Sequence, residues 1–145
     1  MTVRIHDSIA YRIHRAQRVL RRHFLGMATA DGLELTPEQW FVLNKLVERD
    51  GRSQVELCEA IFSDRPNLTR MLVGMEARGW VTRRGDAEDG RRNLVTLTPE
   101  GARVHHQFAA RVEEQRGRIF AGISAEDLAT ATRVLDRIEA NLGGG

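Results

Sequence analysis

Two short amphipathic segments that follow each other almost without a linker constrain this fold most strongly. Ser53 to Phe62 begins with a hydroxyl residue and has a glutamate three residues later, the pattern that caps the start of a helix. Ser63 to Gly79 then begins a second helix, with proline in its first turn and glycine as its natural stop. Two short helices joined by a tight connection indicate a helix-turn-helix.

A β-hairpin and four longer helices are predicted around these two segments. Residues 80–84 and 93–97 are rich in β-branched and aromatic side chains, and the polar loop 85–92 separates them. Apolar periodicity and capping residues predict the flanking helices at about Asp7 to Ala28, from Thr36 to Asp50, from Thr98 to Gly122 and after Ser124. The predicted fold is therefore mainly α with a small β-hairpin, in the α+β class.

The apolar stripes of the flanking helices indicate which faces are covered. The helix after Thr36 is expected to bury Trp40, Leu43, Leu46 and Val47. The last helix has apolar residues at alternating steps of three and four, the spacing of a seam between helices. This seam consists of Leu128, Ala131, Leu135, Ile138 and Leu142. Because the seam and the apolar first helix need a partner surface, the sequence predicts a homodimer.

The composition bounds the class of protein. With 145 residues, 41% hydrophobic and 29% charged, the chain can bury one sizeable core, so a single domain is expected. It has neither a signal-peptide pattern nor an apolar run of about 18 residues, which predicts a soluble, cytoplasmic protein without membrane contact. All 22 basic residues except Lys45 are arginines, and none forms a polybasic tail. Any binding of nucleic acid must therefore use individually positioned arginines.

The ordered sequence of these segments resembles the MarR family of transcriptional regulators over nearly the whole chain. The resemblance is carried by Leu35–Trp40, Asn67–Leu72 and Glu76–Val81, and it is densest over Arg83–Gly101. It implies a single winged helix-turn-helix domain, with a DNA-binding lobe at about 36–97 and dimerisation helices at 1–30 and 100–142. It further implies a homodimeric repressor that binds a pseudo-palindromic operator in double-stranded DNA and is released by a small aromatic or phenolic ligand.

The second short helix, at about Asp64 to Arg78, is the expected recognition helix. Arginine can bind guanine bidentately, asparagine can recognise adenine, and threonine can contact a phosphate or a thymine methyl. The candidate contacts near its start are Arg65, Asn67, Thr69 and Arg70. The alternative interpretation is an ordinary solvated helix face.

The hairpin tip is the second expected contact with DNA. Arg91 and Arg92 can enter a minor groove, and Asp89 can hold Arg91 extended. The Asp-x-Arg pattern of the family that this chain resembles corresponds to Asp89 and Arg91. Gly90 lies between them, where the family often has a basic residue. The alternative is a solvated loop in which Asp89 and Arg91 pair only with each other.

A ligand site and a reactive thiol are weaker candidates. The resemblance implies a cleft for an aromatic acid or phenol, which His14, Phe24, Trp40 and Phe41 would line, although an aromatic stripe is more often plain core. Cys58 lies among apolar residues, which favours an inert thiol over an oxidant sensor. His105 and His106 are adjacent on a helix and point about 100° apart, so they do not form a chelating pair.

No cofactor and no metal are expected, and no motif of an enzyme is recognisable. Two other functions stay open beside the regulator. One is a helical dimer of winged-helix shape that acts only through protein partners, and the other is a redox sensor that uses Cys58.

Overall fold

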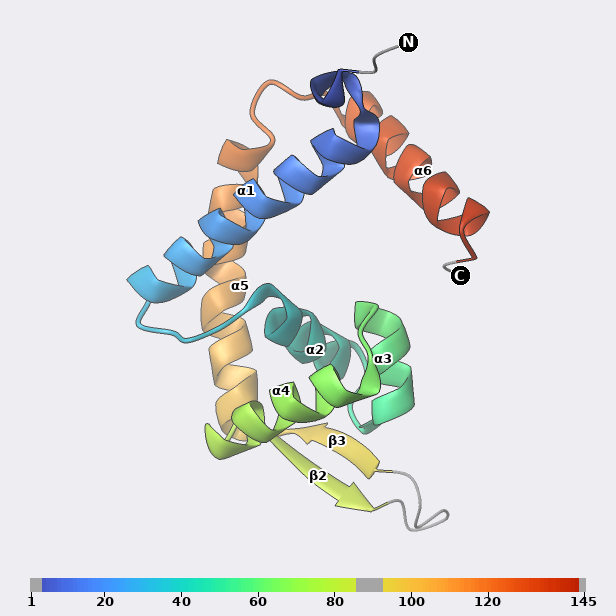
Figure 1. Ribbon diagram of the computed structural model, residues 1–145. Coiled ribbons are helices and arrows are strands. Elements are labelled where there is room, and N and C mark those ends of the chain that lie inside the picture. Colours follow the sequence, from blue (N-terminus) through green and yellow to red (C-terminus); the bar gives the residue numbers. More distant parts are fainter. Residues whose placement is uncertain (1–3, 86–92, 144–145) are drawn as a thin grey trace. The chain divides into compact units, whose positions relative to one another are not determined.

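The computed structural model of the protein describes residues 4–85 and 93–143, and the chain divides into two compact units, residues 1–111 and 112–145. The described part consists of helices and one small sheet (Figure 1), which confirms the predicted fold class. In chain order the elements are a 3₁₀ turn (Ile5–Asp7), α1 (Ile9–Ala30), α2 (Pro37–Glu48), β1 (Arg52–Ser53), α3 (Gln54–Ile61), α4 (Arg65–Ala77), β2 (Val81–Gly85), β3 (Asn93–Leu97), α5 (Pro99–Ile119) and α6 (Ala125–Asn141).

Side-chain caps start the helices where the sequence predicts them. Thr36 and Gln39 form a complete capping box at α2. The Ser53 hydroxyl accepts a hydrogen bond from the Glu56 amide at 3.2 Å, and the Asp64 carboxylate accepts one from the Asn67 amide at 2.8 Å. These bonds satisfy amide groups that have no partner within their own helix. The capping residues therefore fix where α2, α3 and α4 begin.

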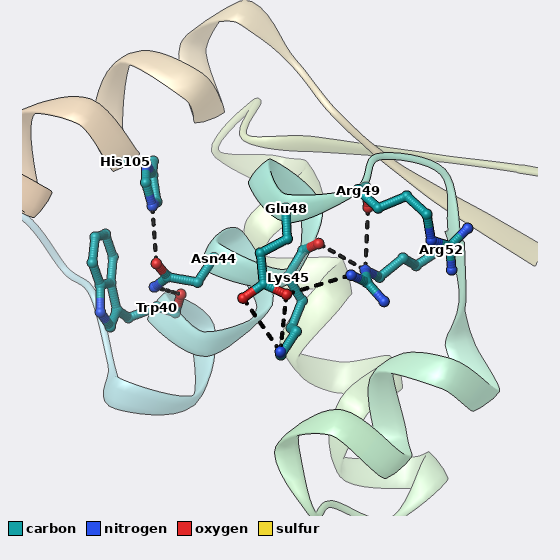
Figure 2. A network of polar contacts seen from close by, with 7 residues as sticks. All are labelled: Trp40, Asn44, Lys45, Glu48, Arg49, Arg52 and His105. Atoms are coloured by element: carbon teal, nitrogen blue, oxygen red, sulfur yellow. Dashed lines mark hydrogen bonds and ion pairs between the residues drawn. The ribbon is translucent and has the colours of Figure 1, made fainter.

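The sheet contains a third strand that the sequence did not reveal. β1 pairs with β3 in an antiparallel register, and the strand order is β1-β3-β2. β1 has two residues, which is too short for an alternating pattern to be recognised. The Arg52 side chain holds this strand at the end of α2 (Figure 2): its Nε donates to the carbonyl oxygens of Lys45 at 2.7 Å and Arg49 at 3.1 Å.

The core of the first unit lies among α2, α3, α4, the sheet and α5. Val42, Leu43 and Leu46 of α2 are fully buried, whereas Val47 is 49% exposed. The prediction that Val47 belongs to the buried stripe is wrong: Val47 lies toward one edge of the buried face and in the last turn of α2, where its side chain stays in contact with water. The remaining core residues include Leu57, Leu68, Leu72, Met75, Val81, Val95, Val104 and Phe108.

An ion pair connects α5 to the residue that ends α1. The Arg111 guanidinium lies 2.6 Å from Asp31 Oδ1, and the Asp31 side chain is 12% exposed. The hydrogen bond from Arg111 lowers the pKa of Asp31 in the folded protein. A carboxylate whose folded-state pKa is lowered stabilises the fold above its unfolded-state pKa of about 4, and this contribution disappears as the pH falls through the lower, folded-state value.

We therefore expect Asp31→Asn to lower the melting temperature at pH 7 and to lose this effect in acid. The difference from the wild type should shrink as the pH falls from 5 to 3, since protonation removes the same charge from the wild type. Glu38→Gln is the control, because the Arg21–Glu38 pair is more exposed, at 36% and 39%, and contributes less. A pH-independent difference for Asp31→Asn would contradict the role of this pair.

None of the helices in the described part of the chain has the length and apolar composition needed to cross a membrane.

Candidate nucleic-acid interface and aromatic cluster

The first two turns of α4 present polar side chains to solvent above a buried apolar face. Leu68, Leu72 and Met75 are fully buried against the core. Arg65, Asn67 and Arg70 are exposed, as predicted, and the Arg65 guanidinium makes no hydrogen bond or ion pair with any residue that the structure describes. This end of α4 therefore combines a rigid support with cationic and amide groups facing outward.

Hydrogen bonds link Asn67 and Arg70 to each other and to the capping residue Asp64 along one side of α4. Asp64 Oδ2 accepts a hydrogen bond from the Asn67 side-chain amide at 2.6 Å, and Asn67 Oδ1 accepts one from the Arg70 guanidinium. The positions are three residues apart, so the side chains lie next to each other on the helix surface. The chain of contacts holds Arg70 in one orientation before any ligand binds.

Thr69 differs from the other predicted contacts. Its hydroxyl donates to the Arg65 carbonyl oxygen at 2.9 Å and lies 3.4 Å from the side-chain amide of Gln54, which is 7% exposed. Thr69 is half-buried, and its hydroxyl connects α4 to α3. Thr69 thus lies between the two helices, at the edge of the exposed surface formed by Arg65, Asn67 and Arg70.

The hairpin carries further arginines toward its tip. Arg83 pairs with Glu76 of α4 at 2.9 Å, whereas Arg84 is exposed and, within residues 4–85 and 93–143, makes no ion pair. The Thr82 and Thr96 hydroxyls lie 2.6 Å apart and join the two strands. The predicted contacts Asp89, Arg91 and Arg92 lie outside the described residues.

A cluster of aromatic rings joins α1, α2 and α5. The Trp40 ring stacks on His105 with centroids 4.7 Å apart and meets Phe108 edge to face at 5.3 Å. Phe24 meets Phe108 at 5.0 Å. Figure 2 shows His105 facing Asn44, whose Oδ1 lies 3.1 Å from His105 Nε2 and whose amide donates to the Trp40 carbonyl oxygen at 2.8 Å. Burial lowers the pKa of His105, and the neighbouring His106 lowers it further.

Two of the four predicted pocket residues belong to this cluster. Phe24 and Trp40 both contact Phe108, but Phe41 is 49% exposed and His14 is exposed on α1. His105 also belongs to this cluster, although the sequence suggested it only as a possible metal ligand; its place directly after the buried Val104 marks it as a neighbour of the apolar stripe. His23 was not predicted as a site residue, and its Nε2 is buried without a hydrogen-bond partner among the described residues.

The thiol of Cys58 is only partly accessible. It lies on α3 and is half-buried. Burial raises the pKa of this thiol, and the positive charge of Arg65 opposes the effect more weakly. A raised pKa reduces the fraction of thiolate, which is the form that oxidants attack.

The apolar seam residues of the second unit are at most half-buried. α6 has no buried residue: Leu128 and Ile138 are half-buried, and Leu135 and Leu142 are 43% and 83% exposed. In the first unit, Ile9, Val19 and Leu20 of α1 are also between 48% and 63% exposed. Both helices thus present apolar surface that this single chain leaves in contact with water.

The chain is similar to known proteins both in its central segment and in its whole fold. A family model described as MarR family matches residues 33–92. A crystal structure of the PcaV transcriptional regulator from Streptomyces coelicolor is 30% identical, covers 91% of this chain and 97% of that chain, and has a TM-score of 0.69.

Two further solved structures match closely. A second PcaV structure, in complex with its natural ligand, is 26% identical, has a TM-score of 0.87 and covers 97% of each chain. The transcriptional repressor CouR, bound to a 23-mer DNA duplex, is 25% identical with a TM-score of 0.83, over 95% of this chain and 99% of that one.

Proposed function

Because this chain belongs to the MarR family of DNA-binding transcriptional regulators, we propose that it is a homodimeric repressor that binds a pseudo-palindromic operator. Its ligand would be a small aromatic or phenolic molecule that releases it from DNA. The observation that carries the proposal is the exposed end of α4, where Arg65, Asn67 and Arg70 stand above a fully buried apolar face.

The chemistry of this end of α4 suits the major groove of duplex DNA. Arginine forks match the two acceptors on the edge of guanine, and Asn67, which is bonded to Asp64 and Arg70, holds the Arg70 fork in place. The CouR structure, which resembles this chain over most of its length, is a complex with a DNA duplex. In this proposal residues 36–97 form the DNA-binding lobe, and Asp89, Arg91 and Arg92 add a minor-groove contact at the hairpin tip.

The exposed apolar faces of α1 and α6 support a homodimer. Burying a leucine fully contributes about 1.5–3 kcal/mol, and the seam of α6 offers Leu128, Leu135 and Leu142 in addition to Ile138. A second copy of the chain would cover these residues through helices 1–30 and 100–142. The two copies would then present two α4 helices to successive turns of the duplex.

The aromatic cluster is the proposed site for the effector. Trp40 and Phe24 supply apolar ring surface, and His105, which stacks on Trp40, is a polar group beside them. His23, the residue before Phe24 on α1, has a buried Nε2 without a hydrogen-bond partner among the described residues. A binding site of this kind, mostly apolar with a few polar groups, suits a small aromatic acid or phenol. A crystal structure of PcaV contains its natural ligand, which supports a ligand-responsive mechanism.

The redox alternative has less support. The half-buried position and raised pKa of Cys58 both disfavour a rapid reaction with oxidants. A partner-only function would leave the exposed Arg65 and Arg70 without a role.

Selection from random duplex DNA tests the proposal directly. We expect a consensus with two-fold symmetry and half-sites about 10 base pairs apart, and an affinity that falls steeply with salt. A panel of aromatic acids and phenols should then contain compounds that release the selected duplex and quench the fluorescence of Trp40. An asymmetric consensus would contradict the homodimeric mode, and the absence of any enrichment would contradict DNA recognition.

A further inference from the structure

Phe62 has a backbone conformation that side chains rarely adopt. It ends α3 in the left-handed region, with φ 53° and ψ 50°. Its amide donates to the Glu59 carbonyl oxygen at 3.3 Å, and the Ser63 amide donates to that of Cys58 at 3.0 Å. This is the Schellman pattern of a helix end, in which glycine is the usual residue because it has no Cβ to clash.

The rest of the chain follows this preference. Every other residue with positive φ in the described part is a glycine: Gly32, Gly51, Gly79, Gly122 and Gly143. Within residues 4–85 and 93–143, Phe62 alone has a side chain at such a position, and that side chain is 84% exposed. The strained backbone and the exposed phenyl ring each reduce stability, and at 84% exposure the ring gains little from contacts with the described residues. Residues that keep such strain often do so for function.

The position of Phe62 indicates what that function is. It lies two residues before Asp64, the residue that caps α4, and Figure 1 shows a short connection from the end of α3 to the start of α4. Arg65, three residues after Phe62, is exposed and carries a free positive charge in the described structure. The ring therefore belongs to the same exposed end of α4 that the proposed function directs into the major groove.

We propose that Phe62 contacts the C5-methyl group of a thymine in each half-site, at the edge of the base pairs that α4 recognises. In the major groove this methyl is the apolar group that distinguishes thymine, and a phenyl ring is a suitable partner for it. The exposed cationic Arg65, three residues further along the chain, favours the negatively charged duplex as the occupant over an apolar protein surface. The inference rests on the proposed function, because it requires that α4 bind DNA.

Two substitutions at this position separate the contact from the strain. Phe62→Gly should raise the melting temperature by about 3 °C, since glycine relieves the left-handed strain. It should nevertheless weaken binding to the selected duplex. Loss of the methyl contact costs about four-fold in each half-site, and the two half-sites together give about fifteen-fold. Phe62→Ala removes the ring but keeps the strain, so it should weaken binding equally without the gain in stability. Val47→Ala, at an exposed apolar position on α2, is the control for both measurements.

The DNA side of the contact is tested by replacing each thymine of the selected duplex with uracil, which lacks only the methyl group. Wild-type protein should lose about four-fold in affinity at one thymine in each half-site, and Phe62→Gly should be insensitive there. If Phe62→Gly binds as tightly as the wild type, or if its loss does not coincide with a uracil-sensitive position, the inference is wrong. A change in oligomeric state on Phe62→Gly would assign the ring to a protein contact and would also overturn it. Failure of the wild-type protein to bind any duplex would instead contradict the proposed function.

Discussion

Replacing Gly101 with alanine should destabilise the protein by about 3 kcal/mol, because a Cβ atom at this position has no room. That atom would lie 2.1 Å from the Trp80 carbonyl oxygen and 2.9 Å from Leu97 Cδ1. The carbonyl group cannot move freely, since it accepts a hydrogen bond from the Thr98 amide at 3.1 Å. The close approach of α5 to the start of β2 therefore requires glycine.

Gly101→Ala should weaken DNA binding in addition to lowering stability. Thr98 caps α5 through the Gly101 amide at 2.9 Å, so the same contact sets the direction in which α5 leaves the hairpin. A shift of Trp80 would move β2, which pairs with β3 from Val81↔Leu97 to Gly85↔Asn93. We expect Gly101→Ala to bind the selected duplex more weakly even under conditions in which it remains folded.

Gly117→Ala in the same helix is the matched control. Beyond its chain neighbours and the backbone of its own helix, no atom of the described residues lies within 4 Å of a Cβ placed at Gly117, and alanine is favoured over glycine in a helix interior by up to about 1 kcal/mol. Thermal unfolding at equal protein concentration should therefore move in opposite directions for the two variants, because the melting temperature of a dimer depends on concentration. Equal melting temperatures for Gly101→Ala and the wild type would mean that the backbone adapts at no cost.

Local signals in the sequence predicted most of the fold. Thr36, Ser53, Asp64 and Ser124 all cap helices, and each acts through a hydrogen bond to an amide three residues later, so a single sequence is enough to find them. Gly79 similarly ends its segment with a positive φ of 73°. Contacts between residues near each other in the chain leave patterns that periodicity and capping rules detect.

The features that were missed depend on contacts distant in the chain. β1 exists because Arg52 and Ser53 pair with Val95 and Leu94, more than 40 positions away, and two residues show no period of their own. His105 joins the aromatic cluster through Trp40 and Asn44, 65 and 61 positions before it. The conformation of Phe62 was also not predictable, because the sequence pattern favours glycine where this chain has an aromatic residue.

For the predicted site residues, exposure could be predicted from the sequence, but the bonds between their side chains could not. The side chains of Arg65, Asn67 and Arg70 are exposed at one end of α4. This was predictable because helical periodicity alone puts them on a different face from the buried Leu68 and Leu72. Helical periodicity does not show that Asp64, Asn67 and Arg70 bond to each other, because side-chain orientation determines those bonds. The hydrogen bonds change the expected roles: both polar atoms of the Asn67 side chain are already in use, while Arg70 retains further donors for a base.

Arg70→Ala should therefore relax the preference for one base pair in each half-site by about 1–3 kcal/mol, or about 5- to 160-fold in relative affinity. Asn67 Oδ1 holds the Arg70 guanidinium in place before binding, so the fork meets guanine with little further loss of side-chain freedom. Asn67→Ala removes this support and should weaken binding without changing which base pair is preferred.

Arg70→Lys decides between recognition of a base and attraction to phosphate. Lysine keeps the charge but lacks the planar fork, so this variant should lose the base preference and retain the salt dependence of the wild type. Competition titrations with the selected duplex and with duplexes altered at single base pairs, each at several salt concentrations, measure both quantities. If Arg70→Ala instead weakened all sequences alike and lowered the salt slope by about one unit per subunit, Arg70 would contact a phosphate, and base recognition by α4 would fall to Arg65, whose guanidinium has no competing bond within the described chain.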